Sequence, residues 1–279
     1  MKTACVIGWP ISHSRSPLIH NFWLKQYGIS GNYGIVPVQP QDLPGFIDSL
    51  QDAGYSGCNV TIPHKETVYS LVTSRDEPAE RVGAANTLYV SGARLHATNT
   101  DGEGFIANVK ATAPRLALSN ARVAILGAGG SAMAIIGALL DEGASEIAVF
   151  NRTVEKANAL RDRFGKLVVP HKWEHRNSHI SEISLLINTT SLGMGSQPPL
   201  DIDLKHLAQD AAVADIVYSP LVTPLLEQAA RRGNVTIPGL GMLLHQAVRG
   251  FELWFGERPE VTRELYELVA KDVDPGYVP

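Results

Sequence analysis

Short apolar runs alternate with stretches of helical spacing over the first hundred residues. The runs at residues 4–8, 33–38 and 57–62 are typical of strands, and residues 17–27 and 43–53 between them have the spacing of helices. Such a βαβαβ alternation predicts a parallel sheet with right-handed crossovers. These residues are therefore expected to form one α/β layer structure.

The pattern then changes to a hairpin and later to a second alternation. Residues 85–89 and 94–98 flank Ser91-Gly92, a pair typical of hairpin turns, so the first sheet is expected to gain an antiparallel edge. Further strand-like runs follow at 122–126, 146–150, 185–188, 213–217 and 235–237. They predict a second α/β sheet.

The last amphipathic segment is expected to return to the first sheet. Residues 242–255 carry apolar side chains on one broad helix face that needs a partner, and Pro238 to Gly241 before it form a candidate hinge. A chain of 279 residues also exceeds the size at which one hydrophobic core keeps growing. The predicted fold class is therefore α/β with two domains.

Composition narrows the class of partner. The formal net charge of -4 gives no general attraction to nucleic acid or to an anionic membrane, and no apolar run approaches the ~20 residues that cross a bilayer. The N-terminal run is stopped by Pro10, so no signal peptide is expected. Cys5 and Cys58 lack CxxC spacing, which suits a reducing compartment, and the cytoplasm is the simplest expectation.

A glycine-rich loop marks a nucleotide site in the second half. In "VAILGAGGSAMA", Gly127, Gly129 and Ala132 match the G-x-G-x-x-G/A spacing, with a strand before them and a helix after. Gly127 allows the tight turn, Gly129 lets backbone amides approach a pyrophosphate, and Ala132 permits close packing of helix on strand. This context predicts dinucleotide binding rather than a turn of structural use only.

The residues after the next strand favour NADP. An NAD site usually has an acid there for the ribose 2′-hydroxyl, but this chain has Asn151-Arg152-Thr153 and then Lys156. A guanidinium pairs with a 2′-phosphate through a planar fork. Arg152 read as an ordinary surface charge would leave the missing acid unexplained.

Polar residues recur where strands of the first half are expected to end. They are Ser14 and Ser16 in "HSRSP", Asn59, Thr61 and Lys65 in "NVTIPHKE", Asn86 in "GAANT", and Asp101 in "NTDG". Each has an ordinary structural explanation; Ser16 before Pro17, for example, is a good helix N-cap. Ligands of open α/β sheets nevertheless bind beyond the carboxyl ends of strands, so these residues can converge on one pocket.

The order of motifs resembles the shikimate dehydrogenase family along nearly the whole chain. The matching stretches are "GWPISHSRSPLIHN", "NVTIPHKE", "GAANTL", "NTDGEG", "GAGGSAMA", "NRT", "INTTSLGM", "DIVYSPLVTPLL" and "GLGMLLHQAVRGFELW". The resemblance implies reversible NADPH-dependent reduction of 3-dehydroshikimate to shikimate. It also implies a substrate domain of residues 1–104 and 238–279, completed by C-terminal helices, and a Rossmann cofactor domain of residues 105–237, with the active site in the cleft.

The resemblance assigns roles residue by residue. Lys65 and Asp101 would be the catalytic pair; Ser14, Ser16 and Tyr218 would contact the carboxylate; and Asn59, Thr61, Asn86, Asp101 and Gln246 would contact ring hydroxyls. The expected cofactor contacts are Gly127, Ala128, Gly129, Gly130, Asn151, Arg152, Thr153, Thr189, Met194, Gly239 and Met242. Ser131 and Met133 stand where the family often has Ala and Arg, which weakens the basis for a strict NADP preference.

Elementary chemistry agrees with the assigned pair. Hydride delivered to a ketone creates a developing alkoxide that needs a proton donor, and Lys65 can be that donor in reduction and the base in oxidation. A carboxylate beside it would hold the ammonium group in place. Closure of the two domains about linkers near residues 104 and 238 would exclude water.

Other functions were weighed against an NADP-dependent shikimate dehydrogenase. A relative that also accepts quinate or NAD differs by few side chains, and a regulator that binds NADP without catalysis would share the fold. His171, His175 and His179 would align on a helix as zinc ligands, but their neighbours predict a solvated surface, so no metal is expected. The chain is expected to be a monomer or a homodimer.

Overall fold

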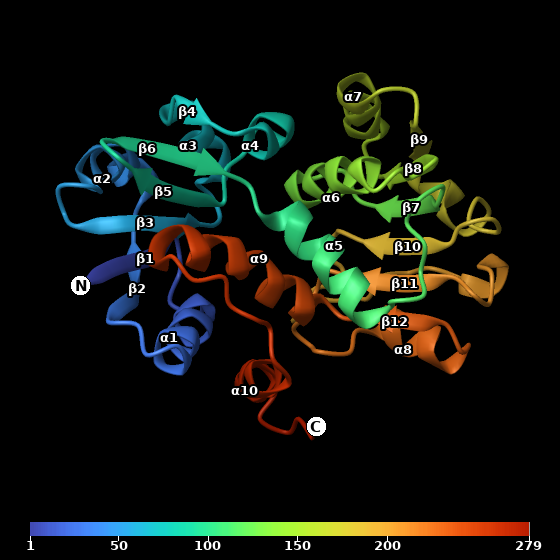
Figure 1. Cartoon of the computed structure of the whole chain (residues 1–279). Coiled ribbons are helices and arrows are strands. Elements are labelled where there is room, and N and C mark those ends of the chain that lie inside the picture. Colours follow the sequence, from blue (N-terminus) through green and yellow to red (C-terminus); the bar gives the residue numbers. More distant parts are fainter. Residues whose placement is uncertain (279) are drawn as a thin grey trace. The chain divides into compact units, whose positions relative to one another are not determined.

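The computed structural model describes residues 1–278. They form two compact units: unit 1 contains residues 1–101 and 244–269, and unit 2 contains residues 102–243 and the chain from 270 on. Each unit has its own sheet (Figure 1). None of the described helices has the length and apolar character required to cross a membrane.

The six-stranded sheet of unit 1 has the order β2-β1-β3-β5-β6-β4. Its strands are β1 (Lys2–Gly8), β2 (Gly31–Pro37), β3 (Tyr55–Val60), β4 (Ser74–Arg75), β5 (Thr87–Ser91) and β6 (Arg94–Thr98). The strands β2, β1 and β3 are parallel, as the alternation predicted. The β5–β6 pair is antiparallel as predicted, but the expected antiparallel edge is wrong, because β4 continues the sheet and pairs parallel with β6.

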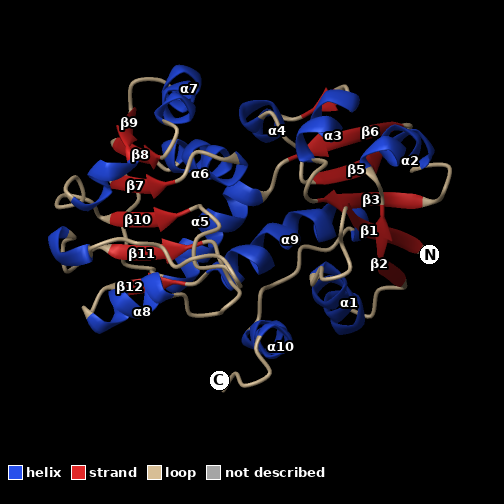
Figure 2. Cartoon of the chain, turned by 180° about the vertical axis from the view of Figure 1, so that it is seen from behind, coloured by secondary structure: helices blue, strands red, loops and turns tan. Residues whose placement is uncertain are grey.

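Helices cover both faces of this sheet (Figures 1 and 2). They are α1 (Ser16–Gln26), α2 (Leu43–Ser49), α3 (Lys65–Leu71), α4 (Glu77–Val82) and part of α9 (Gly239–Phe255), with a 3-10 turn at Pro40–Asp42. Side chains alternate along a strand, so Cys5 and Ile7 of β1 share one face, where they join residues of α2 and α3 in one core. Trp23 of α1 and Trp254 of α9 are fully buried.

The six-stranded sheet of unit 2 has the order β12-β11-β10-β7-β8-β9, and neighbouring strands in it are parallel. Its strands are β7 (Arg122–Leu126), β8 (Glu146–Asn151), β9 (Val168–Lys172), β10 (Leu185–Asn188), β11 (Ala212–Asp215) and β12 (Val235–Ile237). The sequence pattern missed β9 because Pro170 interrupts it. A proline is tolerated there because β9 is an edge strand.

Apolar side chains of β7 and β10 point alternately to two cores. Val123 and Ile125 pack with α5 (Asp101–Thr112), α6 (Gly130–Asp141) and α7 (Val154–Phe164). Ala124 and Leu126 pack with α8 (Pro224–Arg231) on the other face (Figure 2). The remaining elements are 3-10 turns at Trp173–Asn177 and Leu204–His206 and the helix α10 (Arg263–Val273).

Both segments expected to act as linkers contain helix. Residue 104 lies inside α5, and Gly239 to Gly241 already belong to α9. A side chain at Gly241 would collide with the amide of Asn108, whose Nδ2 donates to the Pro238 carbonyl oxygen at 2.9 Å. This glycine therefore permits close packing of α9 on α5, whereas the pattern suggested a hinge.

Candidate active site

An ion pair lies where the chain leaves β3. Lys65 is the first residue of α3, and its Nζ lies 2.7 Å from Oδ2 of Asp101, the first residue of α5. The lysine side chain is 30% exposed and the aspartate side chain 13%. The structure therefore brings the predicted pair together and leaves the ammonium group accessible to a ligand.

The second carboxylate oxygen of Asp101 is held by Asn86. Asn86 Nδ2 donates to Asp101 Oδ1 at 2.8 Å and to Thr100 Oγ1 at 3.0 Å, while Asn86 Oδ1 accepts the Thr100 amide at 2.9 Å. The backbone N–H of Asp101 donates to Asn99 Oδ1 at 3.1 Å. Asn86 and Asp101 are both buried. These bonds give the carboxylate one orientation relative to Lys65.

Asn59 stands near the end of β3 and is 6% exposed. Its Oδ1 accepts a hydrogen bond from the Tyr33 hydroxyl at 2.5 Å, and its Nδ2 faces Thr87 Oγ1 at 3.3 Å and the Asn86 carbonyl oxygen at 3.4 Å. Thr61 follows on the loop before α3 and is half-buried. On α9, Gln246 Oε1 lies 3.5 Å from Thr100 Oγ1.

The two predicted serines lie at the start of α1. The backbone N–H of Ser16 donates to Ser14 Oγ at 3.3 Å. The explanation of Ser16 as a helix cap is wrong, because Arg15 occupies the cap position and Ser16 is already helical. The Ser16 hydroxyl is thus not used in capping. Tyr218, the other predicted carboxylate contact, belongs to unit 2, where it follows β11 and is half-buried.

The glycine loop of unit 2 has the geometry that its spacing predicted. Gly127 follows β7 with φ of +107°, and a Cβ there would lie 2.8 Å from Thr189 Oγ1. An added Cβ at Gly129 or Gly130 would meet open space, and α6 begins at Gly130. Ala132 is fully buried. The Gly127 N–H donates to the Phe150 carbonyl oxygen at 2.8 Å, and the loop residues after it lead into the N-terminus of α6, an arrangement suited to a diphosphate.

A cavity of about 170 Å³ adjoins the predicted 2′-phosphate site. It is lined by Asn151, Arg152, Trp173, Thr190, Ser191, Leu192, Gln197 and Pro198. None of these described lining residues is acidic, and Arg152 itself is exposed. Asn151 Nδ2 donates to the Thr153 carbonyl oxygen at 2.8 Å, which orders the triplet. The cavity thus fits an anionic nucleotide end, and Trp173 is a lining residue that the sequence did not indicate.

The other predicted cofactor contacts lie in unit 2. Thr189 Oγ1 donates to the Leu126 carbonyl oxygen at 2.8 Å, which ties the end of β10 to the end of β7. Met194 is 46% exposed and Met242 is 9% exposed. Gly239 is the first residue of α9.

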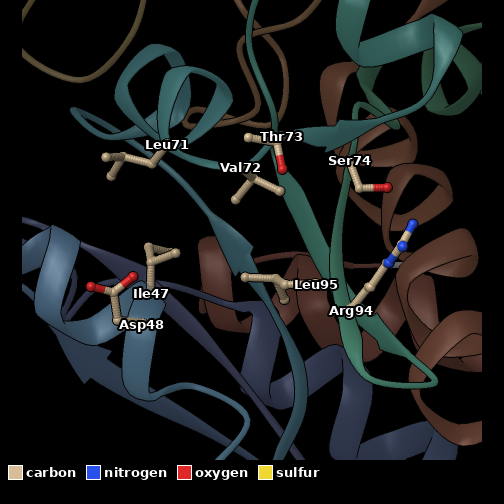
Figure 3. Close-up of a pocket in the computed structure, with 8 residues that line it drawn as sticks. All are labelled: Ile47, Asp48, Leu71, Val72, Thr73, Ser74, Arg94 and Leu95. Atoms are coloured by element: carbon tan, nitrogen blue, oxygen red, sulfur yellow. The ribbon is translucent and has the colours of Figure 1, made fainter.

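A larger cavity in unit 1, of about 490 Å³, does not contain the predicted site residues (Figure 3). Its lining residues are Ile47, Asp48, Leu71, Val72, Thr73, Ser74, Arg94 and Leu95. Arg94 begins β6, whereas the site residues follow the other end of that strand, at Thr98. The cavity is therefore distinct from the candidate active site.

His171, His175 and His179 are the residues that were considered as zinc ligands on one helix. The segment is not one helix, because His171 lies in β9 and His175 lies in a 3-10 turn. The ring centroids of His171 and His179 are 5.1 Å apart, and those of His175 and His179 are 5.3 Å apart. Among the described residues, no group of three His, Cys, Asp or Glu side chains is arranged to hold a metal ion.

Burial shifts the pKa of His20 and the pKa of Asp215, two residues outside the Lys65–Asp101 pair. The pKa of His20 is lowered to about 3 because burial desolvates the imidazole, an effect that an interaction with the Asn59 side chain opposes. The pKa of Asp215 is raised to about 6 by desolvation, although Thr223, the Val217 amide and Asn188 donate to its carboxylate. Both groups make the stability of the fold depend on pH, because burial disfavours the charged form of each.

The geometry thus defines the class of protein. It is an α/β protein in which one unit has a parallel sheet of the dinucleotide-binding type and the other unit holds a lysine–aspartate pair. Family models match three parts of the chain: "Shikimate dehydrogenase substrate binding domain" at residues 6–88, "Shikimate / quinate 5-dehydrogenase" at 109–195, and "Shikimate 5'-dehydrogenase C-terminal domain" at 239–263. The chain belongs to the shikimate dehydrogenase family.

Individual relatives agree over almost their full lengths. The shikimate dehydrogenase (NADP(+)) of Rhodopseudomonas palustris strain TIE-1 is 55% identical, with 98% of each chain covered. The Thermus thermophilus enzyme, solved in complex with NADP(H) and shikimate, is 32% identical with a TM-score of 0.86, covering 98% of this chain and 100% of that one. A Corynebacterium glutamicum quinate dehydrogenase in complex with NAD is 29% identical, with a TM-score of 0.88 and coverages of 96% and 98%.

Proposed function

We propose that the protein catalyses the reversible NADPH-dependent reduction of 3-dehydroshikimate to shikimate, a step in the biosynthesis of aromatic amino acids. The observation that carries this function is the Lys65–Asp101 ion pair at the starts of α3 and α5, with Nζ and Oδ2 2.7 Å apart, in a chain of this family. The relative of Rhodopseudomonas palustris is named for the same NADP-dependent activity, and that of Thermus thermophilus binds NADP(H) and shikimate.

Lys65 is the proton donor in this proposal. NADPH, when bound, supplies the hydride that converts the substrate ketone into an alkoxide. An N–H bond of the Lys65 ammonium breaks as the new O–H bond forms, so the alkoxide is neutralised and the amine is left uncharged. In the oxidation direction the amine removes that proton. Asp101 keeps the ammonium group within hydrogen-bond reach through its Oδ2.

The substrate contacts of the proposal are polar side chains. Ser14, Ser16 and Tyr218 bind the carboxylate; Asn59, Thr61, Asn86, Asp101 and Gln246 bind the ring hydroxyls. The Ser16 hydroxyl does not cap α1, and it interacts with the hydroxyl of Tyr33. A site that hydrogen-bonds every hydroxyl of its ligand rejects an analogue that lacks one, since a buried partner would be left unpaired.

Unit 2 holds the NADP in this proposal. The diphosphate binds the loop formed by Gly127, Ala128, Gly129 and Gly130; Asn151, Arg152 and Thr153 surround the 2′-phosphate; and Thr189, Met194, Gly239 and Met242 lie near the nicotinamide. The open space beside Gly129 and Gly130 and the cavity lined by Arg152 support this assignment. The absence of an acid at the end of β8 favours NADP over NAD.

The wider context belongs to the same proposal. Residues 1–104 and 238–279 act as the substrate domain and residues 105–237 as the cofactor domain, and the protein works in the cytoplasm as a monomer or homodimer. Its partner is a small molecule rather than nucleic acid, in keeping with the net charge of -4. Closure of the two domains on their ligands is part of the hypothesis, and unchanged scattering on ligand addition would contradict it.

The first test is a spectrophotometric assay of the purified protein with 3-dehydroshikimate and NADPH, repeated with NADH and with quinate plus each oxidised cofactor. Turnover confined to NADPH and dehydroshikimate is expected. Comparable turnover of quinate, or comparable turnover with NADH, would instead indicate an enzyme of dual specificity. Cofactor binding without turnover of any substrate would favour a regulator.

The catalytic assignment is tested separately with Lys65→Ala. A loss of about 10²–10⁴-fold in kcat is expected, because that is the usual contribution of a positioned general acid. Lys25→Ala is the matched control, since Lys25 is exposed on α1 of the same unit. Wild-type turnover in the Lys65 variant would refute its role.

A further inference from the structure

A continuous chain of hydrogen bonds runs from Tyr33 to the candidate catalytic pair. The Tyr33 hydroxyl bonds Asn59 Oδ1 at 2.5 Å, and Asn59 Nδ2 bonds Thr87 Oγ1 at 3.3 Å. Thr87 Oγ1 then bonds Asn86 Oδ1 at 3.0 Å, and Asn86 Nδ2 bonds Asp101 Oδ1 at 2.8 Å. The chain thus joins three predicted substrate contacts, Asn59, Asn86 and Asp101, through Thr87, and Tyr33 stands at its head.

All four bonds have the same direction. Tyr33 donates to the oxygen of Asn59, the Asn59 amide donates to Thr87, Thr87 donates to the oxygen of Asn86, and the Asn86 amide donates to the carboxylate. An Asn59 amide turned by 180° would place its oxygen against the Asn86 carbonyl oxygen, and an Asn86 amide turned by 180° would place its oxygen against the negative charge of Asp101. The direction of the chain therefore selects one orientation for each amide, and bonds aligned in series strengthen one another.

Tyr33 is itself held rigidly at the head of this chain. Its ring is 2% exposed and stacks on His20 with centroids 4.1 Å apart. The Asn21 side chain brackets its backbone, donating to the Tyr33 carbonyl oxygen at 2.9 Å and accepting from its N–H at 3.2 Å. Burial holds the pKa of the Tyr33 phenol well above its usual value, so the hydroxyl keeps its proton. The "HN" of the first motif thereby serves to hold Tyr33.

We propose that Tyr33 and Thr87 are positioning residues that fix the amide orientations of Asn59 and Asn86 and so set which substrate hydroxyls the site accepts. The inference rests on the proposed function, because it gives those two asparagines their ligand. Thr87 is fully buried, so its hydroxyl acts only through its neighbours.

Thr87→Val removes the hydroxyl while keeping the shape of the side chain, and Thr87→Ser restores it. Thr87→Val is expected to lower kcat/KM for shikimate roughly 10-fold, mainly by raising its KM, while the KM for NADP changes less than about 2-fold. Thr87→Ser should stay within about 2-fold of wild type. Rescue by serine separates positioning from a loss of packing.

Tyr33→Phe removes the donor at the head of the chain and is expected to give a similar loss. Its matched control is Tyr89→Phe in β5, whose ring stacks on His96 and takes no part in the chain. The double variant Tyr33→Phe/Thr87→Val should lose much less than the product of the two single losses, because both break the same chain. Wild-type kcat/KM in both folded single variants would overturn the proposal.

A second measurement is independent of turnover. Solvent exchange of the side-chain amide protons of Asn59 and Asn86, followed by NMR, should be slow in the wild type and faster in Thr87→Val and Tyr33→Phe. Equal exchange in all three proteins would overturn the chain even if the protein did not act on shikimate. If the wild-type amide protons exchange slowly but the protein shows no turnover of shikimate, the result would count against the proposed function alone.

Discussion

In unit 1 the candidate binding groups are side chains that other side chains hold in place, whereas in unit 2 they are backbone amides exposed by glycine. Asn59 and Asn86 are buried and depend on Thr87 and Asp101 for their orientation. The loop at Gly127 needs only a positive φ and space for the ligand. Buried polar side chains can specify one pattern of hydroxyls, and backbone amides suit any diphosphate, so selectivity for the substrate is expected to reside in unit 1.

The strongest test of this contrast is Asp101→Asn, which should have the largest effect. The new amide cannot neutralise the Lys65 ammonium group, and its own NH₂ group must face either Lys65 or Asn86, both of which are donors. The kcat should therefore fall by about 10²–10⁴-fold. Binding of 2′,5′-ADP, which tests unit 2, should stay unchanged in calorimetry. A weaker nucleotide affinity would mean that the two sites do not separate in this way.

His20 should make unit 1 lose stability in acid. Its pKa is about 3 in the folded state and 6.5 when unfolded, so the unfolded chain binds the extra proton between these values. The free energy of unfolding is therefore expected to fall by about 1.4 kcal/mol per pH unit as the pH drops below the unfolded pKa. Urea unfolding followed by fluorescence of the buried Trp23 and Trp254 measures it, and His20→Phe should flatten the slope. If the pH dependence of the unfolding free energy is the same in His20→Phe as in the wild type, His20 is not the cause of the acid destabilisation.

Asp215 should act in the opposite sense in unit 2. Its pKa is raised from 3.8 to about 6, so between these values the folded state binds more protons than the unfolded state. Its contribution to stability is expected to decrease by about 1.4 kcal/mol per unit as the pH rises from about 4 to about 6. Asp215→Asn should abolish this slope in unfolding monitored by Trp173, the one tryptophan of unit 2 among the described residues.

Arg152→Gln is expected to have a more local effect on the backbone-based site. Loss of the guanidinium should raise the KM for NADP roughly 10-fold, because a charge-assisted contact to the phosphate is removed, and leave the KM for NAD within about 2-fold. Arg161→Gln is a suitable control, since Arg161 lies in the last turn of α7 and does not line the cavity. Equal changes for both cofactors would argue against a 2′-phosphate contact.

Patterns confined to neighbouring residues predicted much of the fold. The runs at 122–126 and 185–188 coincide with β7 and β10, because a buried parallel strand is apolar on both faces, and the run at 235–237 coincides with the edge strand β12. The two-residue β4 and the proline-containing β9 escaped prediction. Each is an edge strand whose existence depends on a neighbour supplied by distant sequence.

The candidate site divides in the same manner. The glycine loop and the polar strand ends were visible in the sequence, since turn chemistry and strand termini leave local signals. Tyr33 and Thr87 gave none, because each looks like an ordinary strand residue. Their importance appears only when β2, β3 and β5 are brought together in one sheet.

The order of residues along the chain was enough to establish the α/β alternation, the family and the side chains available for chemistry. Which of these side chains share hydrogen bonds depended on the folded arrangement: Asn59 meets Tyr33 across 26 residues and Thr87 across 28. Hydrophobic periodicity records the environment of each residue separately, whereas a hydrogen bond requires two atoms about 3 Å apart. That distance is set by strand register and packing, which join segments that are remote in the sequence.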